Sequence, residues 1–206
     1  MGDFDIHVSV LGPISTNCYF IVNTKTRETV VVDPGDRFRT VKRRIEEAEM
    51  RPVAVLLTHG HFDHFLAADA VRETYGVPVY AARAEMELMG EPSLSGGYRL
   101  KKPVSIQADK WLEGGDVIRL AGLEIKVMAT PGHTAGSVCY YIESEKLLLS
   151  GDTLFCGGVG RTDFPTGSAE ELERSIKERI FALPEETAVY PGHGESTTVG
   201  REKGVY

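Results

Sequence analysis

Short apolar runs alternate with polar turns along most of the chain. Helical periodicity occurs at about 37–50, 64–75, 81–89 and 168–182, and Ser168 followed by acidic residues is typical of a helix N-terminus. The stretches "LAGLEI" and "IESEKLL" place short turns between apolar runs and predict hairpins. Strand-like runs occur at about 6–11, 17–23, 28–33, 53–57, 77–80, 117–121, 123–128, 137–142, 146–150 and 187–190. The pattern predicts an α/β protein whose first and last thirds are rich in strands.

The loosest segment is "GEPSLSGGYRLKKP", residues 90–103, which we expect to form a surface loop beside the active site. No repeat, low-complexity tract or linker divides the chain. A length of 206 residues, of which 42% are hydrophobic, provides for one good-sized core. We therefore expect a single domain over residues 1–206.

The charge balance and the apolar runs exclude some classes of partner. Lys and Arg number 23 against 30 Asp and Glu, so the net charge is -7, which argues against a nucleic-acid substrate. No apolar run approaches the roughly 18 to 20 residues that span a bilayer, and no signal-like segment opens the chain. Cys18, Cys139 and Cys156 are widely separated, as expected of small buried side chains in a reducing compartment. We expect a cytoplasmic protein without a membrane partner.

Three histidines and an aspartate lie within "THGHFDH", residues 58–64, directly after an apolar run. His59 and His61 are two positions apart in an extended segment, so both point the same way and can reach one ion. Asp63 and His64 follow after the chain turns, and they face a second position. Imidazole and carboxylate groups are ligands for zinc, iron and manganese. The motif therefore predicts a metal site where a strand gives way to a helix.

Other candidate ligands also follow apolar runs. His133 lies in "TPGHTAG" and His193 in "YPGHG", each in a Pro-Gly-His turn, and Asp152 follows the run in "LLLSGDTLF". A carboxylate has two oxygens and can bridge two cations. Five of the six histidines thus lie at strand-end turns, whereas His7, on the first predicted strand, is expected to be a surface or hydrogen-bonded residue.

This series of motifs resembles the metallo-β-lactamase superfamily, in order and in approximate spacing, across residues 58–194. The resemblance implies an αββα four-layer sandwich with two metal ions at one edge. Asp33, in "VVVDPG", matches the superfamily's early aspartate, which implies that it orients the ligands; a strand-ending Asp-Pro turn is the alternative. The implied ligands are His59, His61 and His133 for one metal, Asp63, His64 and His193 for the other, and Asp152 as the bridge between them.

The chemistry expected of such a site is hydrolysis. Two divalent cations lower the pKa of a shared water to around neutrality, so that a bridging hydroxide attacks a carbonyl group. Asp152 bridges the cations, and Asp63 accepts a hydrogen bond from the water. Zinc is the expected metal, with iron and manganese as alternatives. No GxSxG motif is present for serine chemistry.

The stretch "GDTLFCGGVGRTDFPTGS" and the end of the chain resemble the short, single-domain type of glyoxalase II, which hydrolyses thioesters such as S-lactoylglutathione. In that family a basic residue at the position of Arg161 helps to hold glutathione, which implies that Arg161 contacts a substrate carboxylate. A structural ion pair with Asp163, which stands where the family carries a tyrosine, is the alternative. Arg201 and Lys203 are further candidates, although solvated charge is the expected state of both.

Three other functions compete with the thioesterase. A persulfide dioxygenase shares a "GRTDF"-like segment and would use one iron, held by residues matching His59, His133 and Asp152. A metallo-RNase uses a similar ligand set but needs the basic surfaces that this chain lacks, and a non-catalytic metal module does not need seven ligands. Cys156 is expected to be a small buried residue, and the lack of a cysteine ligand argues against an antibiotic-hydrolysing lactamase. Monomer and dimer both remain open.

Overall fold

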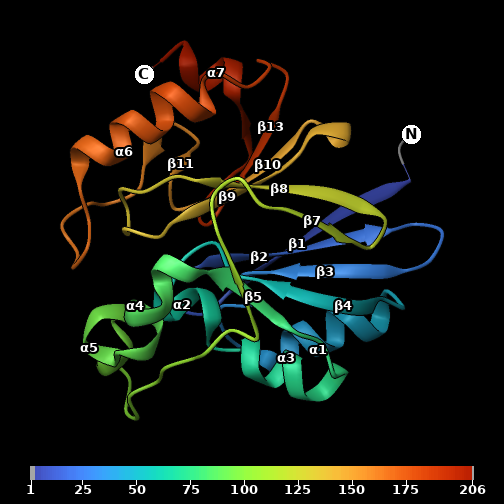
Figure 1. Ribbon diagram of the computed structural model, residues 1–206. Coiled ribbons are helices and arrows are strands. Elements are labelled where there is room, and N and C mark those ends of the chain that lie inside the picture. Colours follow the sequence, from blue (N-terminus) through green and yellow to red (C-terminus); the bar gives the residue numbers. More distant parts are fainter. Residues whose placement is uncertain (1–2, 206) are drawn as a thin grey trace.

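Two six-stranded β-sheets face one another, and helices cover the outer face of each (Figure 1). The computed structural model describes residues 3–205. This layering confirms the four-layer sandwich expected from the sequence. The first sheet contains, in spatial order, β1 (Phe4–Leu11), β2 (Thr16–Asn23), β3 (Glu28–Val32), β4 (Arg51–Leu56), β5 (Val79–Ala82) and β6 (Lys110–Leu112). The second contains β14 (Thr197–Thr198), β13 (Ala188–Pro191), β10 (Leu147–Gly151), β9 (Val138–Ile142), β8 (Leu123–Ala129) and β7 (Val117–Leu120).

Helices α1 (Phe38–Glu47) and α3 (Ala68–Tyr75) pack on the first sheet, whereas α6 (Ala169–Ser175) and the π-helical turn η4 (Ile176–Ile180) pack on the second (Figure 1). No helix within residues 3–205 has the length and apolar character needed to cross a membrane. The remaining elements are α2 (Phe62–Phe65), α4 (Met86–Gly90), α5 (Pro92–Ser95), α7 (Val199–Lys203), the 3₁₀ turns η1 (Arg83–Glu85), η2 (Gly97–Arg99) and η3 (Glu143–Glu145), and the hairpin β11 (Leu154–Phe155) with β12 (Gly158–Val159).

The apolar side chains form three layers, one between the sheets and one under the helices on each side. Central strands supply two layers at once because successive side chains point to opposite faces. In β9, Tyr140 lies between the sheets, whereas Cys139 and Tyr141 face α6. Burial of both faces explains why "VCYYI" reads as a continuous apolar run instead of an alternating one.

Parallel pairing brings several strand ends to one edge of the sandwich. Strands β3 and β4 are parallel, as are β10 and β13, so the carboxyl ends of each pair lie at the same edge of their sheet. The two edges meet where the backbone N–H of Asn17 donates to the carbonyl of Gly192 at 2.7 Å. The polar residues that follow these strands are thereby collected in one region.

The helix predicted over 64–75 is divided into α2 and α3. The loop after β3 causes the interruption: the N–H of Ala67 donates to the carbonyl of Pro34 at 2.9 Å, outside the helical ladder. Gly35 packs so closely on this turn that a Cβ there would lie 1.9 Å from the Asp63 carbonyl oxygen. A contact between two loops, which local periodicity does not record, thus ends the first helix after one turn.

Other boundaries differ from the sequence predictions. Strand β5 extends through Ala82, so the helix predicted over 81–89 begins later, at η1 and α4. The segment 90–103, expected to be a loop, contains α5 and η2, with Pro92 at the first turn of α5 where a missing N–H is tolerated. The very short strands β6, β11, β12 and β14 and the helix α7 have no periodic signal. Both predicted hairpins, β7–β8 and β9–β10, are present.

Candidate metal centre

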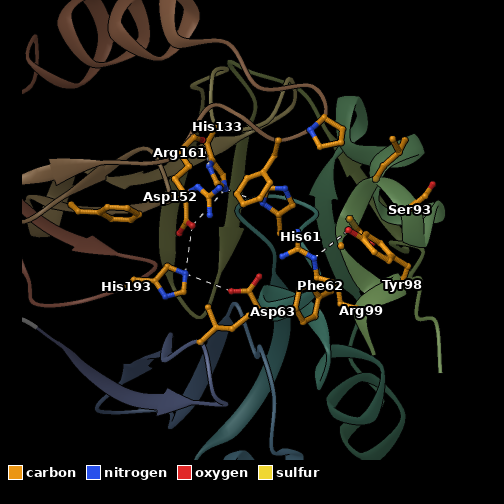
Figure 2. Close-up of a pocket in the computed structure, with 17 residues that line it drawn as sticks. His61, Phe62, Asp63, Ser93, Tyr98, Arg99, His133, Asp152, Arg161 and His193 are labelled. Carbon is orange, nitrogen blue, oxygen red and sulfur yellow. Dashed lines mark hydrogen bonds and ion pairs between the residues drawn. The ribbon is translucent and has the colours of Figure 1, made fainter. Parts of the chain in front are cut away.

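The seven predicted ligands all lie beyond the carboxyl ends of strands, and the structure brings them together. The segment that carries His59, His61, Asp63 and His64 follows β4. His133 follows β8, Asp152 follows β10, and His193 follows β13. Figure 2 shows five of these side chains, His61, Asp63, His133, Asp152 and His193, converging from both sheets.

Three groups of ligand atoms lie within 4.8 Å of one another, and two of these groups share no residue, while the third, His59, His64 and Asp152, joins them. The first triad is His59, His61 and His133, and the second triad is Asp63, His64 and His193. His61 Nδ1 and His133 Nε2 approach to 2.9 Å, so both nitrogens point into the first triad. The two groups match the two ligand sets that the family resemblance implies.

Asp152 lies between the two triads. Its Oδ1 is 3.5 Å from His64 Nε2, and its Oδ2 is 3.5 Å from both His133 Nε2 and His193 Nε2. One carboxylate therefore contacts members of both triads. This is the position that a carboxylate shared by two cations requires.

Four buried atoms of the cluster have no hydrogen-bond partner among the described residues: His59 Nε2, His61 Nε2, His64 Nε2 and Asp152 Oδ1. His61 turns its other nitrogen, Nδ1, into the first triad, so the other three atoms test whether metal ions fit the cluster. A buried polar atom left in that condition costs about 1–3 kcal/mol. Divalent cations accept electron pairs from imidazole nitrogen and carboxylate oxygen, so a pair of cations would satisfy these atoms. The cluster thus suits a dinuclear metal site.

Asp33 forms a hydrogen bond with His64 of the second triad, on the side of the ring that faces away from the cluster. Its Oδ2 accepts the Nδ1 proton of His64 at 3.0 Å and the hydroxyl proton of Thr58 at 2.7 Å, and its Oδ1 accepts the Thr58 N–H at 2.8 Å. Donation from Nδ1 leaves the lone pair of His64 on Nε2, which faces the cluster. Asp33 is 2% exposed and occupies the left-handed backbone region at φ 49°. It is therefore placed to orient a ligand.

Other predicted ligands form hydrogen bonds with side chains and carbonyl groups that no sequence motif predicts. The Thr16 hydroxyl donates to Asp63 Oδ2 at 2.9 Å, although 47 positions separate the two residues. The Nδ1 atoms of His133 and His193 lie 2.6 Å and 3.3 Å from main-chain carbonyl oxygens, of Arg161 and Ser15 respectively. Only the Thr58 hydroxyl, 3.2 Å from His59 Nδ1, adjoins the ligand motif in sequence and could have been inferred from it.

Burial and neighbouring charges shift the pKa values of the two triads in different directions. Burial lowers the pKa of His61 to about 3 and also lowers those of His59 and His133, which keeps their nitrogens neutral. Burial opposes protonation of His64 too, but Asp152 and the other nearby carboxylates outweigh it and raise its pKa to about 10. The first triad thus offers neutral imidazoles, and the second pairs imidazoles with carboxylates that favour positive charge.

A pocket of about 460 Å³ opens over the cluster. Aromatic and aliphatic side chains form much of its wall, including Ile14, Phe62, Phe155 and Phe164. The helical segment 93–99 forms one side, from which Tyr98 and Arg99 project (Figure 2). The segment expected to lie beside the active site therefore lies beside the candidate metal centre.

Two guanidinium groups line this pocket. Arg161 donates to both carboxylate oxygens of Asp163, at 2.9 Å and 2.7 Å, and stacks over the Phe164 ring at 4.3 Å. The ion pair considered as the alternative for Arg161 is therefore present. Arg99 is exposed and donates to the Tyr98 hydroxyl at 3.3 Å, but it pairs with no carboxylate among residues 3–205. Arg201 and Lys203 are exposed and do not line the pocket.

The remaining candidates differ in their outcome. Cys18 and Cys139 are buried, as predicted, but Cys156 is only partly buried, so that prediction is wrong. Cys156 lies at the turn between β11 and β12, where a Cβ on its neighbour Gly157 would meet no atom within 4 Å, so this side of the turn is open. His7 is partly buried and its Nδ1 lies 3.0 Å from Arg44 Nη2, as expected of a hydrogen-bonded strand residue.

The fold and the cluster of histidine and aspartate ligands agree with the comparisons to known proteins. Residues 11–193 match the metallo-beta-lactamase superfamily, and the chain belongs to that superfamily. It is 39% identical to a probable metallo-hydrolase, YqgX, of Bacillus subtilis over 94% of this chain and 92% of that protein. It is 31% identical to the hydroxyacylglutathione hydrolase GloC of Haemophilus influenzae, over 97% and 95% respectively. The superfamily assignment therefore covers most of the chain.

Solved structures agree with the fold over nearly the whole chain. BLEG-1, described as a B3 metallo-beta-lactamase, superposes with a TM-score of 0.92 at 39% identity, covering 97% of both chains. TTHA1623, solved in a di-iron-bound form, gives 0.85 at 35% identity over 96% of both. ETHE1 from Myxococcus xanthus gives 0.76 at 30% identity, over 97% of this chain and 81% of that one.

Proposed function

We propose that this protein is a binuclear metal-dependent hydrolase that cleaves small thioesters such as S-lactoylglutathione. The observation that carries the proposal is the pair of adjacent triads joined by Asp152 beneath an open pocket. In the proposed assignment His59, His61 and His133 hold one metal, Asp63, His64 and His193 hold the other, and Asp152 bridges them. The 31% identity to GloC supports the choice of thioester.

Two divalent cations, zinc first with iron and manganese as alternatives, would supply a hydroxide nucleophile at neutral pH and polarise the substrate carbonyl. The protein's own groups orient and bind. Thr16 fixes the Asp63 carboxylate at the pocket, where the carboxylate would accept a hydrogen bond from the attacking water. Phe62 and Phe164 line the pocket and would exclude water from a bound substrate.

The pocket also fits a substrate with an anionic tail. A thiol carrier such as glutathione has carboxylates, which guanidinium groups bind through charge-assisted hydrogen bonds. We propose Arg161 and Arg99 as the two candidate contacts. Arg161 would have to share its donors with Asp163, whereas Arg99 has no carboxylate to displace among the described residues. Arg99 is therefore the better placed of the two.

The test is the loss of thioester ultraviolet absorbance when purified, metal-loaded protein is added to S-lactoylglutathione. A kcat/KM above about 10⁴ M⁻¹s⁻¹ is expected, within the usual range for enzymes. Asp152→Ala is the control, and it should lose both activity and bound metal because it removes the shared carboxylate. Absence of turnover by protein that holds two metals per chain would reject the thioester and retain the metal centre.

A persulfide dioxygenase is the second candidate, and the 30% identity to ETHE1 is the observation that favours it. Such an enzyme would need one iron, held by His59, His133 and Asp152, and the second triad would have no role. One metal per chain, together with oxygen uptake on addition of glutathione persulfide, would support the dioxygenase. Two metals and no oxygen uptake would support the hydrolase.

The similarity to BLEG-1 makes a β-lactam the appropriate counter-substrate. Both a thioester and a β-lactam present a carbonyl group to the nucleophile, so the metal centre alone does not distinguish them. The same preparation should therefore be assayed with a chromogenic cephalosporin. A higher kcat/KM for the cephalosporin than for S-lactoylglutathione would contradict the thioesterase assignment.

A further inference from the structure

A buried carboxylate, Glu85, lies between the two loops that carry the first triad. It is 1% exposed and ends η1, directly after β5. Its Oε2 accepts the N–H of Gly60 at 2.6 Å, and its Oε1 accepts the N–H of Gly136 at 2.7 Å. Gly60 stands between His59 and His61, and Gly136 follows His133 by three positions. One side chain thus joins both ligand loops through their backbones.

The absence of side chains at the two glycines allows this contact. A Cβ on Gly136 would lie 2.5 Å from Glu85 Oε1, and a Cβ on Gly60 would lie 3.0 Å from Oε2 and 2.6 Å from Met89 Cγ. Both distances to the carboxylate are shorter than ordinary contacts, so larger residues would push the loops away from it. The glycine of "HTAG" is therefore explained by close approach to Glu85, and the glycine of "HGH" by close approach to Met89 and Leu88 of α4 as well as to Glu85.

The chemistry of Glu85 is unusual for a purely structural residue. No Lys, Arg or His among residues 3–205 forms an ion pair with it. Burial raises its pKa, while the N–H groups of Gly60 and Gly136 and the Thr134 side chain oppose this by favouring the ionised form. A buried carboxyl group is retained at such a place when its hydrogen bonds fix a geometry that an apolar residue could not fix.

We propose that Glu85 is a positioning residue for the first triad. By holding Gly60 and Gly136 on its two oxygens, it sets the distance between the loop of His59 and His61 and the loop of His133, and thereby the affinity of the first triad for its metal. The inference rests on the proposed two-metal centre and not on the thioester substrate. Groups that orient ligands in this way typically contribute 10- to 100-fold to metal affinity.

Glu85→Gln tests the inference with little change in volume. Each carboxylate oxygen faces an N–H donor, so the glutamine NH₂ group must meet a donor in either orientation. One of the two loops therefore loses its hydrogen bond to residue 85. We expect one of the two metal sites to bind zinc about 10- to 100-fold more weakly, while the other keeps its affinity. Glu85→Asp, which keeps two acceptors on a shorter chain, should have a smaller effect.

Glu202 provides a matched control. It is also buried, at 2% exposure, and accepts the N–H of Gly157 at 2.8 Å and the hydroxyl proton of Thr197 at 2.5 Å. It joins α7 to the β11–β12 turn and touches neither ligand loop. Glu202→Gln loses the same kind of acceptor, so it should lower thermal stability without changing the affinity for zinc.

The experiment is a competition titration of metal-stripped protein with zinc and a chromophoric chelator, with circular dichroism and thermal unfolding measured in excess chelator. A selective loss of one site in Glu85→Gln, with both sites unchanged in Glu202→Gln, supports the inference. Zinc affinities of Glu85→Gln within about threefold of wild type, below the usual effect of such groups, overturn it. Equal weakening in both variants also overturns it, because a general loss of stability would then explain the result.

Two further outcomes of the titration can be distinguished from a failure of the inference about Glu85 alone. If Glu85→Gln is unfolded in chelator, Glu85→Asp replaces it in the same titration, and unchanged zinc affinity in that variant overturns the inference. If the wild type itself binds fewer than two zinc ions, the two-metal centre fails and the inference fails with it. A protein that binds two zinc ions but does not hydrolyse S-lactoylglutathione leaves the inference intact and rejects only the substrate.

Discussion

Replacing Asp33 by asparagine should weaken metal binding by changing the tautomer of His64. The asparagine side chain has one acceptor and one donor in place of two acceptors. An NH₂ group at the position of Oδ1 would face the Thr58 N–H, which is also a donor. The amide therefore turns its NH₂ toward the Thr58 hydroxyl, which can rotate to accept, and toward His64 Nδ1. His64 must then accept on Nδ1 and carry its proton on Nε2, where a metal would bind.

The magnitude follows from these contacts. The loss of a group that orients a ligand typically lowers metal affinity 10- to 100-fold, or about 1.4–2.8 kcal/mol at 1.4 kcal/mol per factor of ten. The amide oxygen of the variant still accepts the Thr58 N–H, and its NH₂ group donates to His64 Nδ1. The free energy of unfolding in excess chelator should therefore fall only by the difference between a charge-assisted and a neutral hydrogen bond, about 1 kcal/mol. The loss of metal affinity should be greatest at the second triad, because His64 changes tautomer there, whereas the first triad is affected only through the Thr58 hydroxyl, which also contacts His59 Nδ1.

The assay is zinc competition on metal-stripped protein, with kcat/KM for S-lactoylglutathione measured at saturating zinc. Asp109→Asn is the control, because Asp109 Oδ2 likewise accepts a backbone N–H, from Val79 at 2.8 Å, but does not contact the cluster. Asp33→Asn with two zinc sites of wild-type affinity would refute the tautomer argument. Equal losses in Asp109→Asn would also refute it.

The remaining predictions concern metal removal, the pocket and the core. Stripping both metals should lower Tm by about 10–20 °C relative to protein at free zinc 100 times the Kd of each site, because each of the two sites contributes about 2.7 kcal/mol; an unchanged Tm in a calorimetric scan would contradict a folded-state metal site. Arg99→Ala should raise KM for S-lactoylglutathione about tenfold with little change in kcat, whereas Arg161→Ala should have a smaller effect; the opposite ranking in steady-state kinetics would assign the carboxylate contact to Arg161. Leu149→Ala, at a side chain 1% exposed between the sheets, should lower the free energy of unfolding by about 2–5 kcal/mol in a urea titration. Val117→Ala, at a side chain 46% exposed, should change it by less than about 0.5 kcal/mol, and similar values for the two variants would contradict the assigned core.

The sequence was sufficient to predict the strand-end positions of the candidate ligands. Their signal is local, because an apolar run followed by histidine or aspartate marks the point where a buried strand reaches the surface. The distribution of the ligands over two metals came from family resemblance, and the structure groups the same side chains into two triads. Their roles as ligands stay a prediction until metal binding is measured.

The features that were missed depend on contacts between distant segments. Thr16 reaches Asp63 across 47 positions, and Glu85 reaches Gly136 across 51, so no motif joins either pair. The break between α2 and α3 likewise depends on packing of the loop at Gly35. The sequence allows both roles of Arg161, but only the arrangement of the side chains shows that its guanidinium group already donates to Asp163. Periodicity describes single elements and does not register these contacts.

Each triad draws its ligands from both sheets. His59, His61, Asp63 and His64 follow β4 in the first sheet, whereas His133 and His193 follow strands of the second. Cations bound there would link two halves of the fold that are distant in sequence. Such long-range contacts form late in folding. A chain cut between β6 and β7 would leave no complete triad in either fragment. Tight zinc binding by a mixture of the two fragments would therefore report their reassembly.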